Sequence, residues 1–144
     1  MAGLEPSHMG LCVADLERAE RFWCDGLGFE RAERYELTDT LAPGLDAALE
    51  VPAPVDLISQ MIVLGGMKIE LLHYRTPAVE GSPLTSRRQR GLTHASFWVD
   101  DVDAEAARLV GYGGTILPET RSNPGIPIQF LADPDGTRVE LMGR

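Results

Sequence analysis

The chain has 144 residues, of which 44% are hydrophobic and 24% charged, and its formal net charge is −9. This length suits a single domain or two small modules that share a core. No apolar run reaches the ~20 residues of a transmembrane helix. The negative net charge disfavours binding to nucleic acid or to an anionic membrane. The first residues lack the plan of a secretory signal, so we expect a cytoplasmic protein. Neither Cys12 nor Cys24 belongs to a CxxC pair, and we expect both to be reduced and buried.

The first half of the chain predicts a strand, a helix and further strands. In chain order, the expected elements are a strand at 7–13, a helix after Asp15, a strand at 29–35, a loop or short helix at 37–56, and hairpin strands at 60–64 and 67–74. Asp15 can cap the helix, which Gly26 to Gly28 would end, and Gly65-Gly66 would form the hairpin turn. The apolar helix face consists of Leu16, Ala19, Phe22 and Trp23.

The second half predicts the same order after a proline-containing linker at 77–91. In chain order, we expect a strand at 94–99, a helix capped by Asp101, strands at 115–117 and 126–132, a turn at 133–136 and a last strand at 137–142. The apolar helix face consists of Val102, Ala106, Leu109 and Val110. Each half is too small to bury its elements alone, so we expect the two halves to pair.

The two halves also repeat two chemically informative side chains. The run His8-Met-Gly-Leu-Cys-Val-Ala-Asp aligns with His94-Ala-Ser-Phe-Trp-Val-Asp-Asp, and Lys-Ile-Glu70-Leu-Leu aligns with Arg-Val-Glu140-Leu-Met. Each half therefore supplies one histidine near its start and one glutamate near its end. Two histidines and two carboxylates are suitable ligands for a divalent metal ion.

Strand periodicity is compatible with a shared cavity for these four groups. His8 shares its strand face with Gly10 and Cys12, whereas His94 shares its face with Ser96 and Trp98. If the halves pair about a pseudo-twofold axis, the four groups converge. The alternative is that each residue is merely solvated or inherited from a duplicated ancestor, but a solvated face gives no reason for the repeat.

On these motifs, together with Phe22-Trp23, Gly26-Leu27-Gly28 and Phe130-Leu-Ala-Asp-Pro-Asp-Gly, the chain resembles the vicinal oxygen chelate superfamily. This superfamily includes glyoxalase I, methylmalonyl-CoA epimerase, extradiol dioxygenases and the bleomycin and fosfomycin resistance proteins. The resemblance implies an α+β fold of two paired βαβββ modules that form a curved mixed sheet around a metal-binding cup. It divides residues 1–144, a single domain, into module 5–75 and module 92–143, joined by linker 76–91.

The resemblance also implies a ligand set and a reaction type. The metal ligands would be His8, Glu70, His94 and Glu140, holding one ion of Ni, Co, Zn, Mn or Fe. Four ligands favour a lyase, isomerase or epimerase that moves a proton next to a chelated carbonyl through an enediolate, with Glu140 or Glu70 as the catalytic base. Glu70 matches glyoxalase I, where epimerases have Gln, whereas the linker sequence looks like that of the epimerases.

The same residues are also compatible with two other functions. An iron-dependent extradiol dioxygenase would use two histidines and one carboxylate, with Glu70 outside the ligand set. A non-catalytic antibiotic-binding protein would need no metal. In all three cases the partner is a small molecule, bound by Trp98, Cys12 and Arg138, and superfamily members commonly form homodimers.

Overall fold

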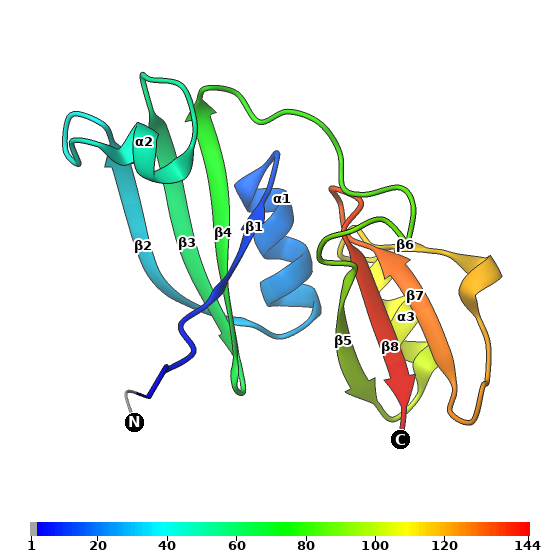
Figure 1. Ribbon diagram of the computed structural model, residues 1–144. Coiled ribbons are helices and arrows are strands. Elements are labelled where there is room, and N and C mark those ends of the chain that lie inside the picture. The colour runs from blue at the N-terminus through cyan, green and yellow to red at the C-terminus, as the bar shows by residue number, and fades with distance from the viewer. Residues whose placement is uncertain (1–2) are drawn as a thin grey trace. The chain divides into compact units, whose positions relative to one another are not determined.

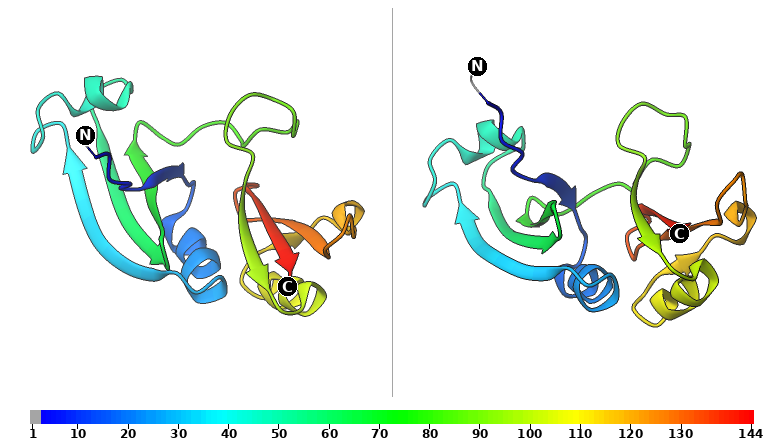
Figure 2. Two further views of the ribbon diagram at one scale, coloured as in Figure 1. Left: turned by 60° about the horizontal axis from the view of Figure 1, so that its bottom comes forward. Right: turned by 90° about the horizontal axis from the view of Figure 1, so that it is seen from below.

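The structure, a computed structural model, describes residues 3–144, so the first two residues of the predicted domain lie outside it. It contains two four-stranded mixed sheets with the same topology, β1-β4-β3-β2 and β5-β8-β7-β6 (Figures 1 and 2). In each sheet the first strand pairs in parallel with the last, and the other pairs are antiparallel. The predicted α+β fold with two βαβββ motifs is therefore confirmed.

The elements of the first motif include the predicted hairpin. They are β1 (Met9–Cys12), α1 (Leu16–Glu20), the π-helical η1 (Arg21–Gly26), β2 (Glu30–Thr38), α2 (Leu45–Leu49), β3 (Asp56–Leu64) and β4 (Met67–Thr76). Gly65, with a φ of 55°, forms the turn between β3 and β4, where glycine avoids the steric cost of a left-handed conformation. The short helix α2 lies within the loop that proline content predicted.

The second motif follows the same order in a shorter form. Its elements are β5 (His94–Val99), α3 (Val102–Val110), β6 (Thr115–Ile116), the 3₁₀ helix η2 (Pro118–Thr120), β7 (Ile128–Ala132) and β8 (Arg138–Gly143). Asp101 caps α3 as predicted, because its Oδ1 accepts a 2.9 Å hydrogen bond from the Ala104 amide. Asp133 organises the predicted β7–β8 turn through hydrogen bonds from the amides of Asp135 (2.9 Å) and Thr137 (2.8 Å).

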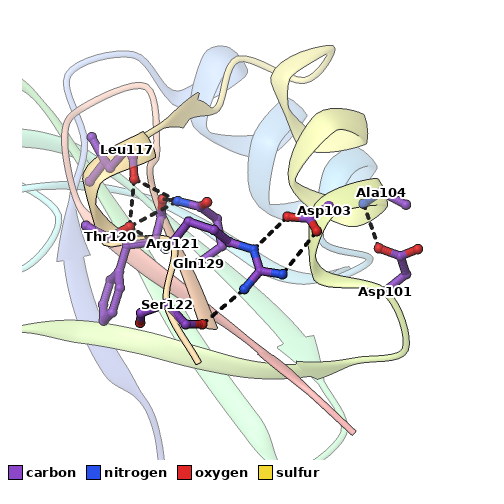
Figure 3. A network of polar contacts seen from close by, with 9 residues as sticks. Asp101, Asp103, Ala104, Leu117, Thr120, Arg121, Ser122 and Gln129 are labelled. Atoms are coloured by element: carbon purple, nitrogen blue, oxygen red, sulfur yellow. Dashed lines mark hydrogen bonds and ion pairs between the residues drawn. The ribbon is translucent and has the colours of Figure 1, made fainter. Parts of the chain in front are cut away.

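A polar network fixes the segment around η2 (Figure 3). The buried Gln129 amide donates to Leu117 O at 2.7 Å and to the Thr120 hydroxyl at 3.0 Å. Nearby, Arg121 forms an ion pair with Asp103 at 2.7 Å, and this pairing lowers the pKa of the Asp103 carboxyl. Every donor of the Gln129 amide therefore has a partner, which satisfies a polar side chain in the sheet interior.

The compact units do not coincide with the two sequence modules. Among the described residues, one unit consists of 3–16 and 28–80, and the other of 17–27 and 81–144. Segment 17–27, which holds most of α1 and all of η1, thus belongs to the unit of the second sheet. The module boundaries at 5–75, 76–91 and 92–143 stay a prediction that describes the sequence repeat.

Specific contacts explain why segment 17–27 belongs to the second unit. The Trp23 indole Nε1 donates to Asp133 Oδ2 at 3.0 Å, and Arg108 of α3 donates to Gly26 O at 2.6 Å. Close packing adds to these bonds, since a Cβ atom on Gly114 would lie 2.9 Å from the Phe22 ring. Burial raises the pKa of Asp133, and this effect outweighs the hydrogen bonds from Trp23, Thr137 and Asp135, which lower it.

Most of the predicted apolar positions are buried, with two exceptions. All four residues predicted for the first helix face are buried, as are Val102, Ala106 and Leu109. Val110, however, the last residue of α3, is 48% exposed. The prediction for cysteine is wrong for Cys12, which is exposed at the end of β1, whereas Cys24 is buried. No helix within residues 3–144 is long and apolar enough to cross a membrane.

Candidate metal centre

The first unit places His8 and Glu70 side by side. Strand β1 pairs in parallel with β4 so that Gly10 lies opposite Glu70, and His8 precedes Gly10 by two residues on the same face. The imidazole Nε2 of His8 is 2.9 Å from Glu70 Oε2. The other carboxylate oxygen, Oε1, accepts a 2.6 Å hydrogen bond from the buried Ser59 hydroxyl on β3.

The second unit repeats this arrangement. Strands β5 and β8 pair with Ser96 opposite Glu140, and His94 again lies two residues earlier. His94 Nε2 is 3.3 Å from Glu140 Oε2, and the Ser96 hydroxyl donates to the same oxygen at 2.7 Å. The His94 ring also packs edge-on against Phe130 of β7, with centroids 5.1 Å apart.

The residue before each histidine fixes its ring. The hydroxyl of Ser7 lies 2.8 Å from Nδ1 of His8, and that of Thr93 lies 2.8 Å from Nδ1 of His94. Because Nδ1 is engaged, Nε2 is the nitrogen that faces the glutamate in both units. Contacts of this kind orient ligating side chains in metal sites.

The donor set fits a divalent cation. Ligands about 2.1 Å from one ion lie roughly 3 Å from each other, and the two Nε2–Oε2 separations of 2.9 and 3.3 Å agree with this value. The same distances suit an N–H···O hydrogen bond, so the duplication of the whole arrangement, rather than either distance alone, is the observation on which a metal site can be proposed. Each unit supplies two donors; among residues 3–144 no group of three or more His, Cys, Asp or Glu side chains is placed to hold an ion.

The comparisons with known proteins identify the family. Residues 6–141 match the Glyoxalase/Bleomycin resistance protein/Dioxygenase superfamily, which covers nearly the whole chain. The chain belongs to this superfamily. The predicted resemblance is thereby confirmed at the level of the superfamily.

One curated relative and several solved structures resemble the chain over most of its length. The chain is 31% identical over 144 residues to the mitochondrial methylmalonyl-CoA epimerase of Mus musculus, covering 94% of this chain and 70% of that protein. A glyoxalase family protein from Bacillus cereus has a similar structure, with a TM-score of 0.80, 20% identity and coverage of 99% and 97% of the two chains. The trypanothione-dependent glyoxalase I of Leishmania major is also similar, with a TM-score of 0.65, 18% identity and coverage of 94% and 84%. The two structural likenesses concern the fold alone.

The side chains predicted to bind substrate lie in different surroundings. Trp98 is 53% exposed and lines a pocket together with Arg144. By strand periodicity Trp98 shares the face that carries His94, and Arg144 directly follows the end of β8. Arg138 is half-buried on the same face and donates to Gly136 O at 2.8 Å. The substrate-binding role of these residues stays a prediction.

In the first unit, Cys12 and Tyr74 occupy the positions that correspond to Trp98 and Arg144. Cys12 shares the face of His8, and Tyr74 shares that of Glu70. Burial raises the pKa of the Tyr74 phenol, and the nearby Cys12 and Glu70 raise it further. Burial and these two neighbours therefore all favour the neutral form of the phenol.

Sequence reasoning missed the four hydroxyls around the metal-competent pairs. Ser7 and Thr93 repeat directly before the two histidines, so the alignment of the halves contained their signal. Ser59 and Ser96 gave no such signal, because they come from strands on opposite sides of their glutamates. Only strand pairing brings each of these two serines within hydrogen-bond distance of a glutamate.

Proposed function

We propose that this protein is a divalent-metal-dependent enzyme that moves a proton on the carbon next to a substrate carbonyl. The metal ligands are His8, Glu70, His94 and Glu140, and the reaction is that of a lyase, isomerase or epimerase. The observation that carries this proposal is the duplicated His–Glu pair, with hydroxyls holding each imidazole and each carboxylate. Superfamily membership adds independent support.

The ligand set favours a Lewis-acid site over the alternatives. When bound, a divalent cation makes the C–H next to a chelated carbonyl more acidic. Glu70 is as close to His8 as a ligand needs to be, whereas an extradiol dioxygenase of the two-His, one-carboxylate type would leave it outside the set. A binding protein without metal would not need either glutamate. We therefore prefer proton transfer to oxygen chemistry as the proposed reaction.

The residues of the chain then divide the remaining tasks. The carboxylate of Glu140 or Glu70 accepts the substrate proton and returns it, as general bases do when they lie within hydrogen-bond reach. Trp98, Arg138 and the exposed Cys12 contact other parts of the substrate. The similarity to methylmalonyl-CoA epimerase suggests an acyl-CoA ester, and the Glu at position 70 suggests an adduct of a 2-oxoaldehyde with a thiol. We further propose a cytoplasmic homodimer.

Solvent-proton exchange tests this function directly. The protein, stripped with chelator and reloaded with Co²⁺, Ni²⁺, Zn²⁺, Mn²⁺ or Fe²⁺, is incubated in D₂O with branched acyl-CoA esters and with 2-oxoaldehyde–thiol adducts. We expect metal-dependent loss of the α-proton signal in the NMR spectrum of one substrate class. Oxygen uptake with catechols in place of exchange would overturn the proposal in favour of a dioxygenase.

A further inference from the structure

The two glutamates are held differently, and we propose that Ser59 and Ser96 are positioning residues that assign them different tasks. Ser59 fixes Glu70 as a ligand, and Ser96 leaves one oxygen of Glu140 free to take the substrate proton. This inference rests on the proposed function and deepens it. It selects one base from the two that the sequence left open.

Both oxygens of Glu70 are engaged. Oε2 faces the His8 imidazole at 2.9 Å, and Oε1 accepts the 2.6 Å hydrogen bond from Ser59. Ser59 is only 1% exposed, so its hydroxyl is shielded from competing water. A carboxylate held at both oxygens cannot rotate to present either one to a substrate. Glu70 is thereby suited to a fixed ligand role.

Glu140 is held through a single oxygen. Oε2 receives both the His94 imidazole, at 3.3 Å, and the Ser96 hydroxyl, at 2.7 Å. Within residues 3–144, no hydrogen bond or ion pair reaches Oε1, and this atom is not among the fully buried atoms without a partner. The free oxygen therefore remains accessible while the rest of the carboxylate is anchored.

Strand register shows that this difference is built into the sheets. Ser96 lies on β5 directly opposite Glu140, and its counterpart in the first unit is Gly10, which has no side chain. Ser59 lies on β3 opposite Leu72 of β4, and its counterpart in the second unit is the apolar Ile128, opposite Met142 of β8. Each glutamate thus accepts a hydrogen bond from one serine hydroxyl. In the first unit this serine lies on β3, on one side of the glutamate's strand, and in the second unit it lies on β5, on the other side.

Two matched variants separate the roles of the serines. For Ser59→Ala we expect the Co²⁺ dissociation constant, measured by isothermal titration, to rise about tenfold to a hundredfold, as for the loss of a group that orients a ligand. Its exchange rate at saturating Co²⁺ should stay within about threefold of wild type. For Ser96→Ala we expect the reverse, an affinity within about threefold and an exchange rate about tenfold to a hundredfold lower.

Rescue variants show whether the hydroxyl itself matters. A Cβ at Gly10 would meet only Leu72 Cδ1, at 3.5 Å, so serine fits there. The double variant Gly10→Ser/Ser59→Ala gives Glu70 the arrangement of Glu140, and should bind Co²⁺ more tightly than Ser59→Ala alone. Ser96→Thr keeps a hydroxyl and should exchange faster than Ser96→Ala. Ser122→Ala, which removes a hydroxyl far from both pairs in sequence, serves as the control, and thermal melts establish that every variant is folded.

The outcomes distinguish this inference from the proposed function. If wild type binds Co²⁺ and exchanges the α-proton but both Ser→Ala variants lose affinity and rate in the same proportion, the division of tasks is wrong while the function stands. If Ser59→Ala lowers the rate and Ser96→Ala the affinity, Glu70 is the base. If wild type neither binds metal nor exchanges protons, the proposed function itself fails.

Discussion

The two sheets have the same topology and the same His–Glu pair, yet their surroundings differ. In the first unit, Glu70 is held at both oxygens, and Cys12 and Tyr74 lie further along the same face. In the second, Glu140 keeps a free oxygen, and Trp98 and Arg144 line a pocket on the corresponding face. The two units therefore share the His–Glu pair but differ in the residues that surround it. Under the proposed function, the first unit mainly holds the metal and the second supplies the base.

The largest effects on exchange rate and metal affinity are expected when Glu140 and Glu70 are replaced in turn. Glu140→Gln removes the proposed base and should lower the exchange rate about 10²–10⁴-fold, or roughly 3–5 kcal/mol in the activation free energy. Glu70→Gln keeps an oxygen donor, so it should weaken metal binding while the rate at saturating metal stays within about tenfold of wild type. Rates are measured by NMR in D₂O. Retained exchange in Glu140→Gln would remove Glu140 as the base.

The Trp23–Asp133 contact is special to the second unit, and Trp23→Phe tests its stability. Loss of the 3.0 Å bond to a buried carboxylate, with some loss of volume, should lower the free energy of unfolding by about 2–3 kcal/mol. Urea titration provides the measurement, with Tyr35→Phe, at a half-exposed tyrosine of β2, as the control. An unchanged midpoint would mean that the indole contributes little to holding segment 17–27.

The same pair predicts a dependence of stability on pH. Burial raises the pKa of Asp133 in the folded protein above that of the unfolded chain. The contribution of Asp133 to the free energy of unfolding is therefore present below the pKa that this group has in the unfolded chain. It is lost as the pH rises through the pKa that the group has in the folded protein. Because the Trp23 hydrogen bond lowers this pKa, Trp23→Phe should raise it and extend the decline to higher pH. Urea midpoints across the acidic range, for wild type and variant, check the sign.

Corresponding positions further along each face test the predicted substrate contacts. Trp98→Ala removes a large half-exposed ring and should raise KM about tenfold, roughly 1.4 kcal/mol, without loss of bound metal. Cys12→Ala, at the equivalent place in the first unit, should change KM less than about twofold. Equal effects from the two variants would contradict the asymmetry between the faces.

The smallest expected effect concerns the cap of α3. Asp101→Ala removes a 2.9 Å hydrogen bond to the Ala104 amide and should lower the free energy of unfolding by about 1 kcal/mol. Asp101→Ser keeps an acceptor and should recover most of this loss, as measured by thermal melts. A larger loss, with altered metal binding, would show that α3 also supports the His94 pair.

The sequence predicted the strands and turns well because their signals are local. Alternation in β5 and the glycines between β3 and β4 depend only on near neighbours. By contrast, the grouping of segment 17–27 with the second unit depends on Asp133, more than a hundred residues away, whose acidic side chain resembles any turn aspartate. Apolar character likewise failed to indicate that Cys12 and Val110 are exposed, because hydrophobicity predicts a face but not what covers it.

The sequence predicted the repeated His and Glu side chains but not the residues that contact them. His8 and Glu70 could be paired in advance because both recur in the second half, and the structure brings them within 2.9 Å. The buried glutamines Gln60 and Gln129 also correspond by strand register, but their spacing to the glutamates differs by one residue, which hid them from alignment. Residues that act across strands become visible only with register.

Metal stoichiometry tests the central claim most directly. We would measure metal per chain by mass spectrometry on protein purified without chelator, comparing wild type with Glu70→Ala and His94→Ala. Four ligands around one ion predict one divalent metal ion per chain, whether the ligands come from one chain or from two copies, and a sharp loss in each variant. Two ions per chain, with each variant losing only one, would show that each pair forms its own site. No metal after reconstitution would show that the repeated pairs are inherited remnants.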